Sequence, residues 1–249
     1  LMNQIADYQD KNDVEFKLRG FLKSELFNEE QASAMYRAGF RWILVGFESG
    51  DEQILKNIRK NATVEDNTRC VKIAKKYGLK VKALMSIGHA GESHESIENT
   101  KKWLLEAKPD DFDCTIITTY PGSPYFDDAI RDNNIYVYTD PKSQDKLFQS
   151  PIDYLVDSDY YKGDPDGGYV SFVWTDHISP ENLVKERNKL ETEVRNKLNI
   201  PFNPGSPGIK FEHSMGQGNI QIPDYILRSS LFKKIKNKNK KYRFKILEQ

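Results

Sequence analysis

Residues 42–50 read Trp42-Ile43-Leu44-Val45-Gly46-Phe47-Glu48-Ser49-Gly50. The run from Trp42 to Phe47 is apolar almost throughout, which is typical of a parallel strand buried on both faces. A carboxylate and a hydroxyl follow directly, so polar side chains come where this strand ends. Parallel strands are joined by crossover helices, and the sequence on either side should therefore alternate strands with helices.

The flanking sequence follows that alternation. Residues 14–19 alternate apolar and charged side chains and predict a strand. Asn28 can cap a helix that Gly39 ends, and Thr63 can cap a second helix that ends at Gly78. The remaining predicted elements are strands over residues 81–87 and 113–119, with a helix between them from Ser93 to Lys108.

This alternation predicts an α/β fold with a parallel sheet, and the unit length favours a full or partial (β/α) barrel over a flat sheet. The pattern stops near Asp127, which divides the chain into a barrel part, 1–127, and a C-terminal extension, 128–249. In the extension we expect loops over 139–168, a strand over 169–174, a helix from Ser179 to Pro201, an irregular segment over 202–223 and a basic tail over 232–249.

Composition excludes several classes of protein. The 249 residues carry 37 Lys and Arg against 37 Asp and Glu, which argues against a protein that coats nucleic acid. No apolar run approaches the length of about 18 residues that a membrane-spanning helix needs. Cys70 and Cys114 cannot form a disulfide framework and no secretory leader precedes them, so we expect a cytoplasmic protein. The four histidines lack ligand spacing, and we expect no metal site on them.

Ligands of parallel α/β folds bind at the carboxyl ends of the strands. On the predicted strand boundaries, Arg19 ends the first strand and could pair with a carboxylate, although a surface ion pair is as plausible. Glu48 and Ser49 end the second strand and suit a ribose or another polyol, unless they only cap the next helix. Gly88 follows the third strand and Tyr120 the fourth, and no GxGxxG or P-loop pattern accompanies them.

In this order and spacing, these segments resemble the second half of the radical SAM enzyme barrel, most closely in the subgroup with an upstream cobalamin-binding domain. The resemblance runs from about Val14 to Phe126. It rests on FKLRG (16–20), MYRAGF (35–40), WILVGFESGDEQILKNIRKNATVED (42–66), KKYGLKVKALMSIGHAGESHESIENTKKWL (75–104) and ITTYPGSPYF (117–126).

The resemblance implies a partial (β/α) barrel with S-adenosylmethionine (SAM) across the strand ends. It would place Glu48 and Ser49 near the ribose and Arg19 near the methionyl carboxylate. Ile87, Gly88 and the backbone around Tyr120 would flank the adenine.

The resemblance also implies the chemistry. Radical SAM enzymes use a four-iron four-sulfur cluster to reduce the sulfonium of SAM, and the resulting 5′-deoxyadenosyl radical abstracts hydrogen from a substrate. In the cobalamin subgroup, methyl transfer and ring formation are typical reactions, and cobalamin is a further cofactor. The expected partners are a small-molecule substrate and an electron donor such as a flavodoxin or ferredoxin.

Two features of the family are missing from the sequence. The family holds its cluster with a CxxxCxxC motif and binds the SAM amino group with a glycine-rich stretch, and neither is present. Both would lie upstream of Leu1, so we expect a C-terminal fragment of a longer enzyme that does not hold the cluster by itself. No catalytic residue is assigned.

Two rival hypotheses remain. A complete small α/β hydrolase or lyase could use Glu48 as a general base, but no second catalytic group stands out. A non-catalytic scaffold could use the basic tail to contact RNA or anionic lipid, although that composition favours solvated terminal residues over such a contact. A nucleic-acid partner is therefore not expected.

Overall fold

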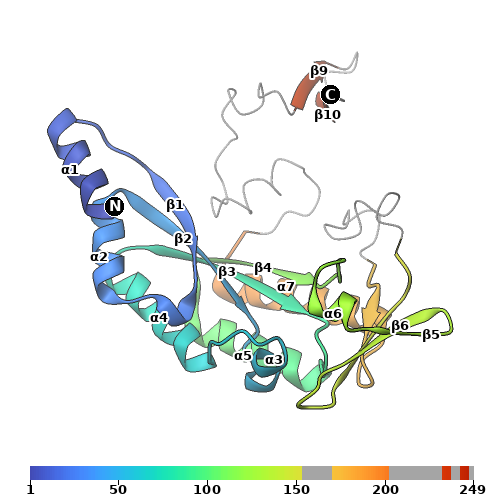
Figure 1. Ribbon diagram of the computed structural model, residues 1–249. Helices are drawn as coiled ribbons and strands as arrows, with labels where there is room; N and C mark the ends of the chain where they lie inside the picture. Colours follow the sequence, from blue (N-terminus) through green and yellow to red (C-terminus); the bar gives the residue numbers. More distant parts are fainter. Residues whose placement is uncertain (153–169, 202–231, 237–241, 247–249) are drawn as a thin grey trace.

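The computed structural model describes residues 1–152 and 170–201 and the two strands 232–236 and 242–246. Its centre is a four-stranded parallel sheet in the order β1-β2-β3-β4, which confirms the predicted α/β class (Figure 1). The strands are β1 Leu18–Leu22, β2 Phe40–Glu48, β3 Lys80–Ile87 and β4 Asp111–Ile116.

Helices α2, α4 and α5 begin where the sequence offers side-chain caps. Asn28, Thr63 and Ser93 each accept a hydrogen bond from a backbone N–H in the first helical turn, and each forms a reciprocal capping box. The helices of this part are α1 Met2–Asn12, the short 3-10 helix η1 Ser24–Leu26, α2 Glu29–Arg37, α3 Glu52–Asn57, α4 Val64–Lys76 and α5 His94–Ala107. Helices α2, α4 and α5 lie along one face of the sheet (Figure 1).

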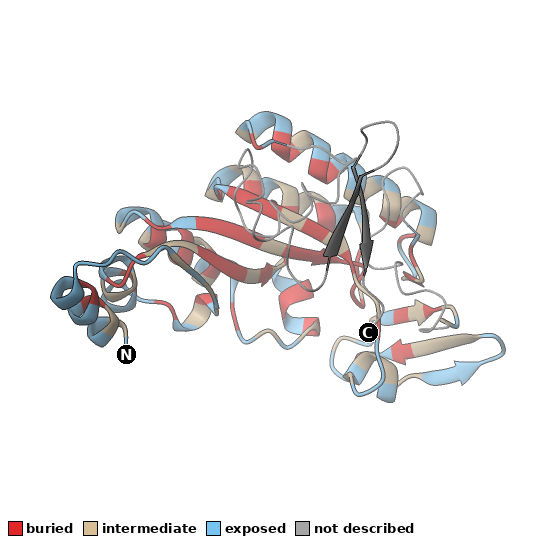
Figure 2. Cartoon of the chain, turned by 90° about the horizontal axis from the view of Figure 1, so that it is seen from above, coloured by how far each residue is buried: buried red, intermediate tan, exposed pale blue. Residues whose placement is uncertain are grey.

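The core lies between the sheet and these helices. On β3, Val81, Ala83, Met85 and Ile87 alternate along the strand and belong to one buried apolar cluster. The residues between them, Lys82 and Ser86 among others, lie on the opposite face of the sheet. Figure 2 shows that buried residues are concentrated in the strands of this sheet.

Two strand boundaries differ from the prediction. The first strand begins at Leu18 instead of residue 14, because only residues from Leu18 onward lie beside β2. Arg19 is therefore the second residue of β1, and the prediction that it ends its strand is wrong. The fourth strand ends at Ile116, so Tyr120 lies in the loop beyond it.

The extension forms a second, antiparallel sheet in the order β5-β6-β7-β8. Its strands are β5 Ile130–Asp132, β6 Ile135–Thr139, β7 Lys146–Gln149 and β8 Val173–Trp174. The prediction of loops over 139–168 is wrong for β7, and the predicted strand over 169–174 contracts to β8. The short helix α6 Pro124–Asp127 leads into this sheet, and the described residues of the 139–168 segment end at 152.

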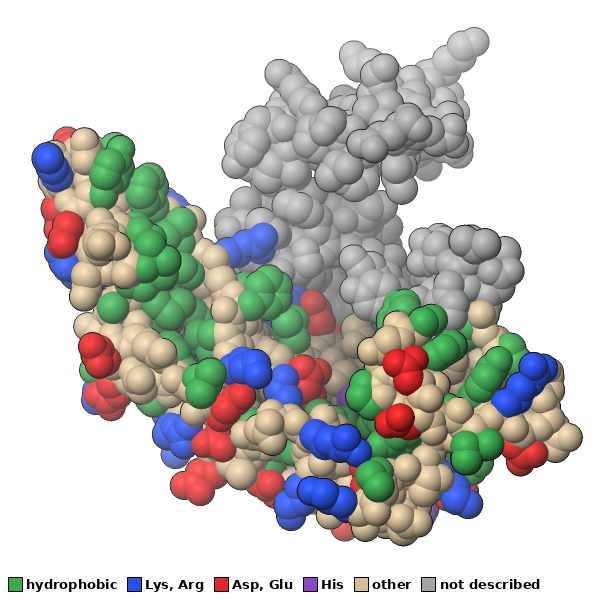
Figure 3. All heavy atoms as spheres, viewed as in Figure 1, with side chains coloured by type: hydrophobic (Ala, Val, Ile, Leu, Met, Phe, Trp, Pro, Cys, Tyr) green, Lys and Arg blue, Asp and Glu red, His purple; other side chains and the backbone are tan. Residues whose placement is uncertain are grey.

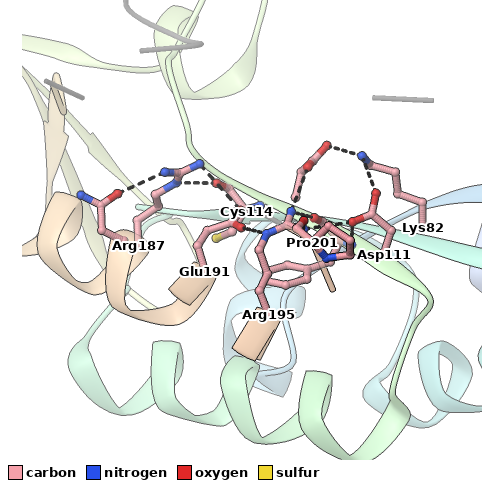
Figure 4. Close-up of polar contacts among 10 residues, drawn as sticks. Lys82, Asp111, Cys114, Arg187, Glu191, Arg195 and Pro201 are labelled. Atoms are coloured by element: carbon pink, nitrogen blue, oxygen red, sulfur yellow. Dashed lines mark hydrogen bonds and ion pairs between the residues drawn. The ribbon is translucent and has the colours of Figure 1, made fainter. Parts of the chain in front are cut away.

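Helix α7, Pro180–Leu198, confirms the helix predicted from Ser179 and packs against β4 and α5. Its charged side chains contact the edge of β4 that faces away from β3 (Figure 4). Arg187 Nε donates to Cys114 O at 2.8 Å, Cys114 N donates to Glu191 Oε1 at 2.7 Å, and Arg195 donates to Phe112 O. These bonds satisfy backbone groups that a neighbouring strand would otherwise pair with.

At the other edge of the sheet, β1 pairs with β2 alone among the described strands. Apolar side chains gather over α1 and β1 in Figure 3. In this part of the chain, Phe21 is 78% exposed and Tyr8 stacks on Phe16. The division of the chain at residue 127 stays a prediction.

The C-terminal strands β9 Phe232–Lys236 and β10 Tyr242–Ile246 pair antiparallel within the segment predicted as a basic tail. The irregular segment predicted over 202–223 lies outside the described residues. Among the described helices, none combines the length and the apolar character needed to cross a membrane.

Candidate functional site

Glu48 ends β2 in a left-handed backbone conformation, with φ of 64°. The pairing of β2 with β3 shifts by one residue between Gly46 and Glu48, and this bulge turns the Glu48 side chain along the end of the sheet. Its Oε1 accepts from Lys60 Nζ at 3.0 Å, and its Oε2 accepts from Ser86 Oγ at 2.8 Å. The carboxylate is thus held by one cation and one hydroxyl.

Gly46 provides the room for this ion pair. A Cβ atom on Gly46 would lie 2.6 Å from Glu48 Oε1 and 3.3 Å from Lys60 Nζ. The side chains of Glu48 and Lys60 are 29% and 20% exposed, so the carboxylate is fixed in place and still open to solvent on one side. A carboxylate in that state can accept hydrogen bonds from the hydroxyls of a ligand.

Ser86 also contacts His89, which in turn lies near Tyr125. Its Oγ lies 2.8 Å from His89 Nε2, and His89 Nδ1 lies 3.5 Å from the hydroxyl of Tyr125. Glu48 binds the serine of this group and not the histidine, whereas a hydrolase triad needs its acid on the histidine. The geometry therefore does not match a serine nucleophile.

Ser49 is placed next to Glu48 but is buried. Its Oγ lies 3.1 Å from Thr100 Oγ1 and accepts from the backbone N–H of Asp51 at 3.1 Å. These contacts join the end of β2 to α5. The role of Ser49 near a ribose stays a prediction, because its hydroxyl already has two partners inside the protein.

Gly88 follows β3 with φ of 91°, a conformation that favours glycine. A Cβ atom here would lie 3.1 Å from Val173 and 3.3 Å from Ile116, so the extension packs directly against the end of β3. The backbone N–H of Gly88 donates to Glu92 Oε2 at 3.0 Å, and Ile87 O accepts from Ile117 N at 2.9 Å. Ile87 and Gly88 thus lie near Glu48 at the carboxyl end of the sheet.

Tyr120 lies at the same end, half-exposed in the loop after β4, where its carbonyl accepts from Ser123. Arg19 does not. It is in register with Trp42 near the start of β2, six residues before Glu48, which corresponds to about 20 Å along a strand. The structure brings Glu48, Ser49, Gly88 and Tyr120 to one end of the sheet and leaves Arg19 at the other.

A groove of about 810 Å³ lies on the outer side of the loop that carries Lys60. Its walls come from α3, from the loop that joins α3 to α4, and from the turn between β6 and β7. Asp145 on one wall accepts from Asn57 Nδ2 on the other at 2.8 Å. Arg59 and Asn61 line this groove, whereas Lys60 between them reaches Glu48.

Two buried groups in the loop after β3 give a testable pH dependence. Burial raises the pKa of Glu92 from 4.5 to about 7 and lowers that of His89 from 6.5 to about 4. The contribution of Glu92 to the free energy of unfolding is fully present below pH 4.5 and is lost as the pH rises to about 7. The contribution of His89 is fully present above pH 6.5 and is lost as the pH falls to about 4. The two slopes therefore cancel between about pH 4.5 and 6.5.

We expect Glu92→Gln to remove this cancellation. The free energy of unfolding of this variant should then rise by about 1.4 kcal/mol per pH unit from about pH 4 to 6.5, whereas that of the parent protein stays level between about pH 4.5 and 6.5. Urea unfolding at a series of pH values measures it. His89→Asn should give the opposite slope, and parallel profiles for all three proteins would contradict the assignment of neutral forms to both groups.

The cysteines do not fit an iron–sulfur cluster. Cys70 lies on α4 and Cys114 on β4, both are buried, and burial raises the pKa of Cys70 to about 12. A cluster needs three thiolates close together. Across residues 1–152 and 170–201, no group of three or more His, Cys, Asp or Glu side chains could hold a metal ion.

Comparison with known proteins identifies what the chain is similar to. Residues 3–104 match the model of the radical SAM superfamily. The matched segment is less than half of the chain, and it is similar to the radical SAM superfamily. The strands β1 to β3, Glu48, Lys60 and Ser86 all lie within the matched segment.

Related proteins extend the comparison beyond the radical SAM segment. The chain is 34% identical over 168 residues to an uncharacterized methyltransferase of Pyrococcus horikoshii, covering 64% of this chain and 34% of that protein. It is 26% identical over 104 residues to the anaerobic magnesium-protoporphyrin IX monomethyl ester cyclase of Rubrivivax gelatinosus, covering 41% and 19%. The chain thus spans about a third or less of the length of these curated relatives.

A solved structure shares the fold over most of this chain. It is the radical SAM methyltransferase TsrM of Kitasatospora setae, with cobalamin and a 4Fe–4S cluster bound. The TM-score is 0.51 at 14% identity, over 83% of this chain and 42% of that one. This likeness supports the fold, including the extension.

Proposed function

We propose that this chain is the SAM-binding part of a radical SAM enzyme, and that Glu48 accepts hydrogen bonds from the ribose of SAM. The observation that carries this proposal is the carboxylate of Glu48, fixed by Lys60 and Ser86 at the carboxyl end of β2 and open on one side. Gly46 leaves space for that arrangement. An ordered acceptor for hydroxyl groups at the strand ends suits a nucleoside.

The other predicted contacts extend this site. Ile87, Gly88 and the backbone near Tyr120 lie at the same end of the sheet and would flank the adenine. Ser49 would support the ribose contact from its position beside Glu48. Arg19 stays a predicted partner of the methionyl carboxylate, but from its position near the amino end of β1 the contact would need SAM to reach along the sheet.

We infer the activity of the whole protein from its relatives. A methyltransferase and a ring-forming cyclase are among them, and TsrM binds cobalamin and a cluster. We therefore propose a methyl transfer or a ring formation on a small molecule, with cobalamin as a further cofactor. Because Cys70 and Cys114 cannot hold the cluster, its ligands would have to come from residues outside this chain.

The proposed function predicts a loss of nucleoside affinity in Glu48→Ala. With the natural full-length protein and S-adenosylhomocysteine as probe, calorimetry should show binding weakened about 10-fold or more, since a hydrogen bond to a charged group contributes about 1.5–3 kcal/mol. Glu65→Ala, at an exposed position of α4, is the matched control and should bind normally. Unchanged affinity in the folded Glu48→Ala protein would show that the nucleoside lies elsewhere.

A further inference from the structure

We propose that Lys60 and Ser86 are positioning residues, which orient the Glu48 carboxylate so that its remaining acceptor sites match the two hydroxyls of an unmodified ribose. This inference rests on the proposed function and adds two residues and a ligand preference to it. Lys60 lies 12 residues after Glu48, in the loop between α3 and α4, and Ser86 lies on β3.

The count of acceptor sites supports this role. A carboxylate has about four lone-pair directions, two on each oxygen. Lys60 occupies one on Oε1 at 3.0 Å, and Ser86 occupies one on Oε2 at 2.8 Å. Each oxygen therefore keeps one acceptor site, and two sites on neighbouring oxygens match the two O–H donors of a vicinal diol.

The backbone at both ends of the ion pair also supports it. Glu48 has φ of 64°, and Lys60 lies between Arg59 and Asn61, with φ of 54° and 58°. Non-glycine residues rarely adopt this conformation, because it costs free energy, and such residues cluster at functional sites. Here the unusual backbone turns Lys60 toward Glu48 while its two neighbours line the outer groove.

His89 fixes the direction of the Ser86 contact. The Ser86 hydroxyl donates to Glu48 Oε2, so its interaction with His89 Nε2 must be one in which the imidazole N–H donates. His89 Nδ1 then accepts from Tyr125. Because His89 is only 7% exposed and held on both sides, Ser86 has one favourable partner for its proton, the carboxylate.

The arrangement also selects among ribose ligands. A phosphate on either ribose hydroxyl would remove a donor and place a second anion against Glu48. Lys60 cannot compensate fully, because it already pairs with Oε1. The site should therefore prefer a free diol over a phosphorylated or deoxygenated sugar.

The test compares two ligands on the natural full-length protein: S-adenosylhomocysteine and its analogue that lacks both ribose hydroxyls. Lys60→Met and Ser86→Ala should each weaken S-adenosylhomocysteine about 5- to 10-fold and change binding of the dideoxy analogue less than 2-fold. Lys60→Arg should restore most of the affinity. A merely structural role would weaken both ligands equally.

Lys56→Met is the matched control, because Lys56 is exposed on α3 and forms no ion pair among the described residues. Equal losses for both ligands, or none in either variant, would overturn the positioning role. Glu48→Ala distinguishes a failure of this inference from a failure of the proposed function. If it discriminates between the ligands while Lys60→Met and Ser86→Ala do not, only this inference fails; if Glu48→Ala does not discriminate either, the proposed function fails as well.

Discussion

Arg195→Met is expected to lower the free energy of unfolding by about 3–5 kcal/mol, the cost of leaving buried charges without their partner. Arg195 is 3% exposed. Its Nε donates to Glu191 Oε2 at 2.6 Å, and its Nη1 lies 3.2 Å from Asp111 Oδ1 (Figure 4). The guanidinium also stacks on the ring of Phe112. Denaturant unfolding followed by circular dichroism measures the loss.

Arg37→Met is the matched control for that change. Arg37 pairs with two carboxylates, those of Asp7 and Asp10, where Arg195 pairs with three, but the Arg37 side chain is 49% exposed. Exposed pairs contribute about 0–1 kcal/mol, so its loss should be small. Arg195→Lys should fall between the two, because it keeps the charge without the planar fork of donors. Equal losses for Arg37→Met and Arg195→Met would contradict the structural role of the buried cluster.

Gly88→Ala is expected to lower the free energy of unfolding by about 2–5 kcal/mol. Part of this is the left-handed backbone, which costs an alanine about 1–2 kcal/mol. The rest is overpacking, because the new Cβ would lie 3.1 Å from Val173 and 3.3 Å from Ile116, and this costs about 1–3 kcal/mol.

Gly122→Ala separates these two contributions. Gly122 has φ of 88°, close to the 91° of Gly88, but no heavy atom lies within 4 Å of its Cβ position. It should therefore lose only the backbone share. Thermal unfolding of both variants gives the difference, and equal losses would show that β8 does not pack against the end of β3 as described.

The local parts of the fold could be predicted from the sequence. Asn28, Thr63 and Ser93 cap helices through atoms within three residues of themselves, so the sequence alone identifies them. The start of β1 could not be predicted in this way. Residues 14–17 alternate like a strand but are exposed, and pairing with a distant segment decides where β1 begins.

The candidate site divides along the same line. Glu48 could be predicted because it directly follows an apolar strand. Lys60 and Ser86 were missed, since a bulge and a loop with two left-handed residues bring them to Glu48. The alternation of β3 could have indicated Ser86. It places this hydroxyl on the face opposite the core residues, beside the end of β2.

The side chains of α7 occupy backbone groups at the β4 edge of the parallel sheet. The backbone carbonyl of Phe112 and the backbone N–H and carbonyl of Cys114 already bond to side chains of α7. These groups are therefore not available to pair with a further strand beside β4. Charged side chains of α7 thus take the place of a neighbouring strand at these two residues of β4, and in this way α7 limits how far a barrel can close.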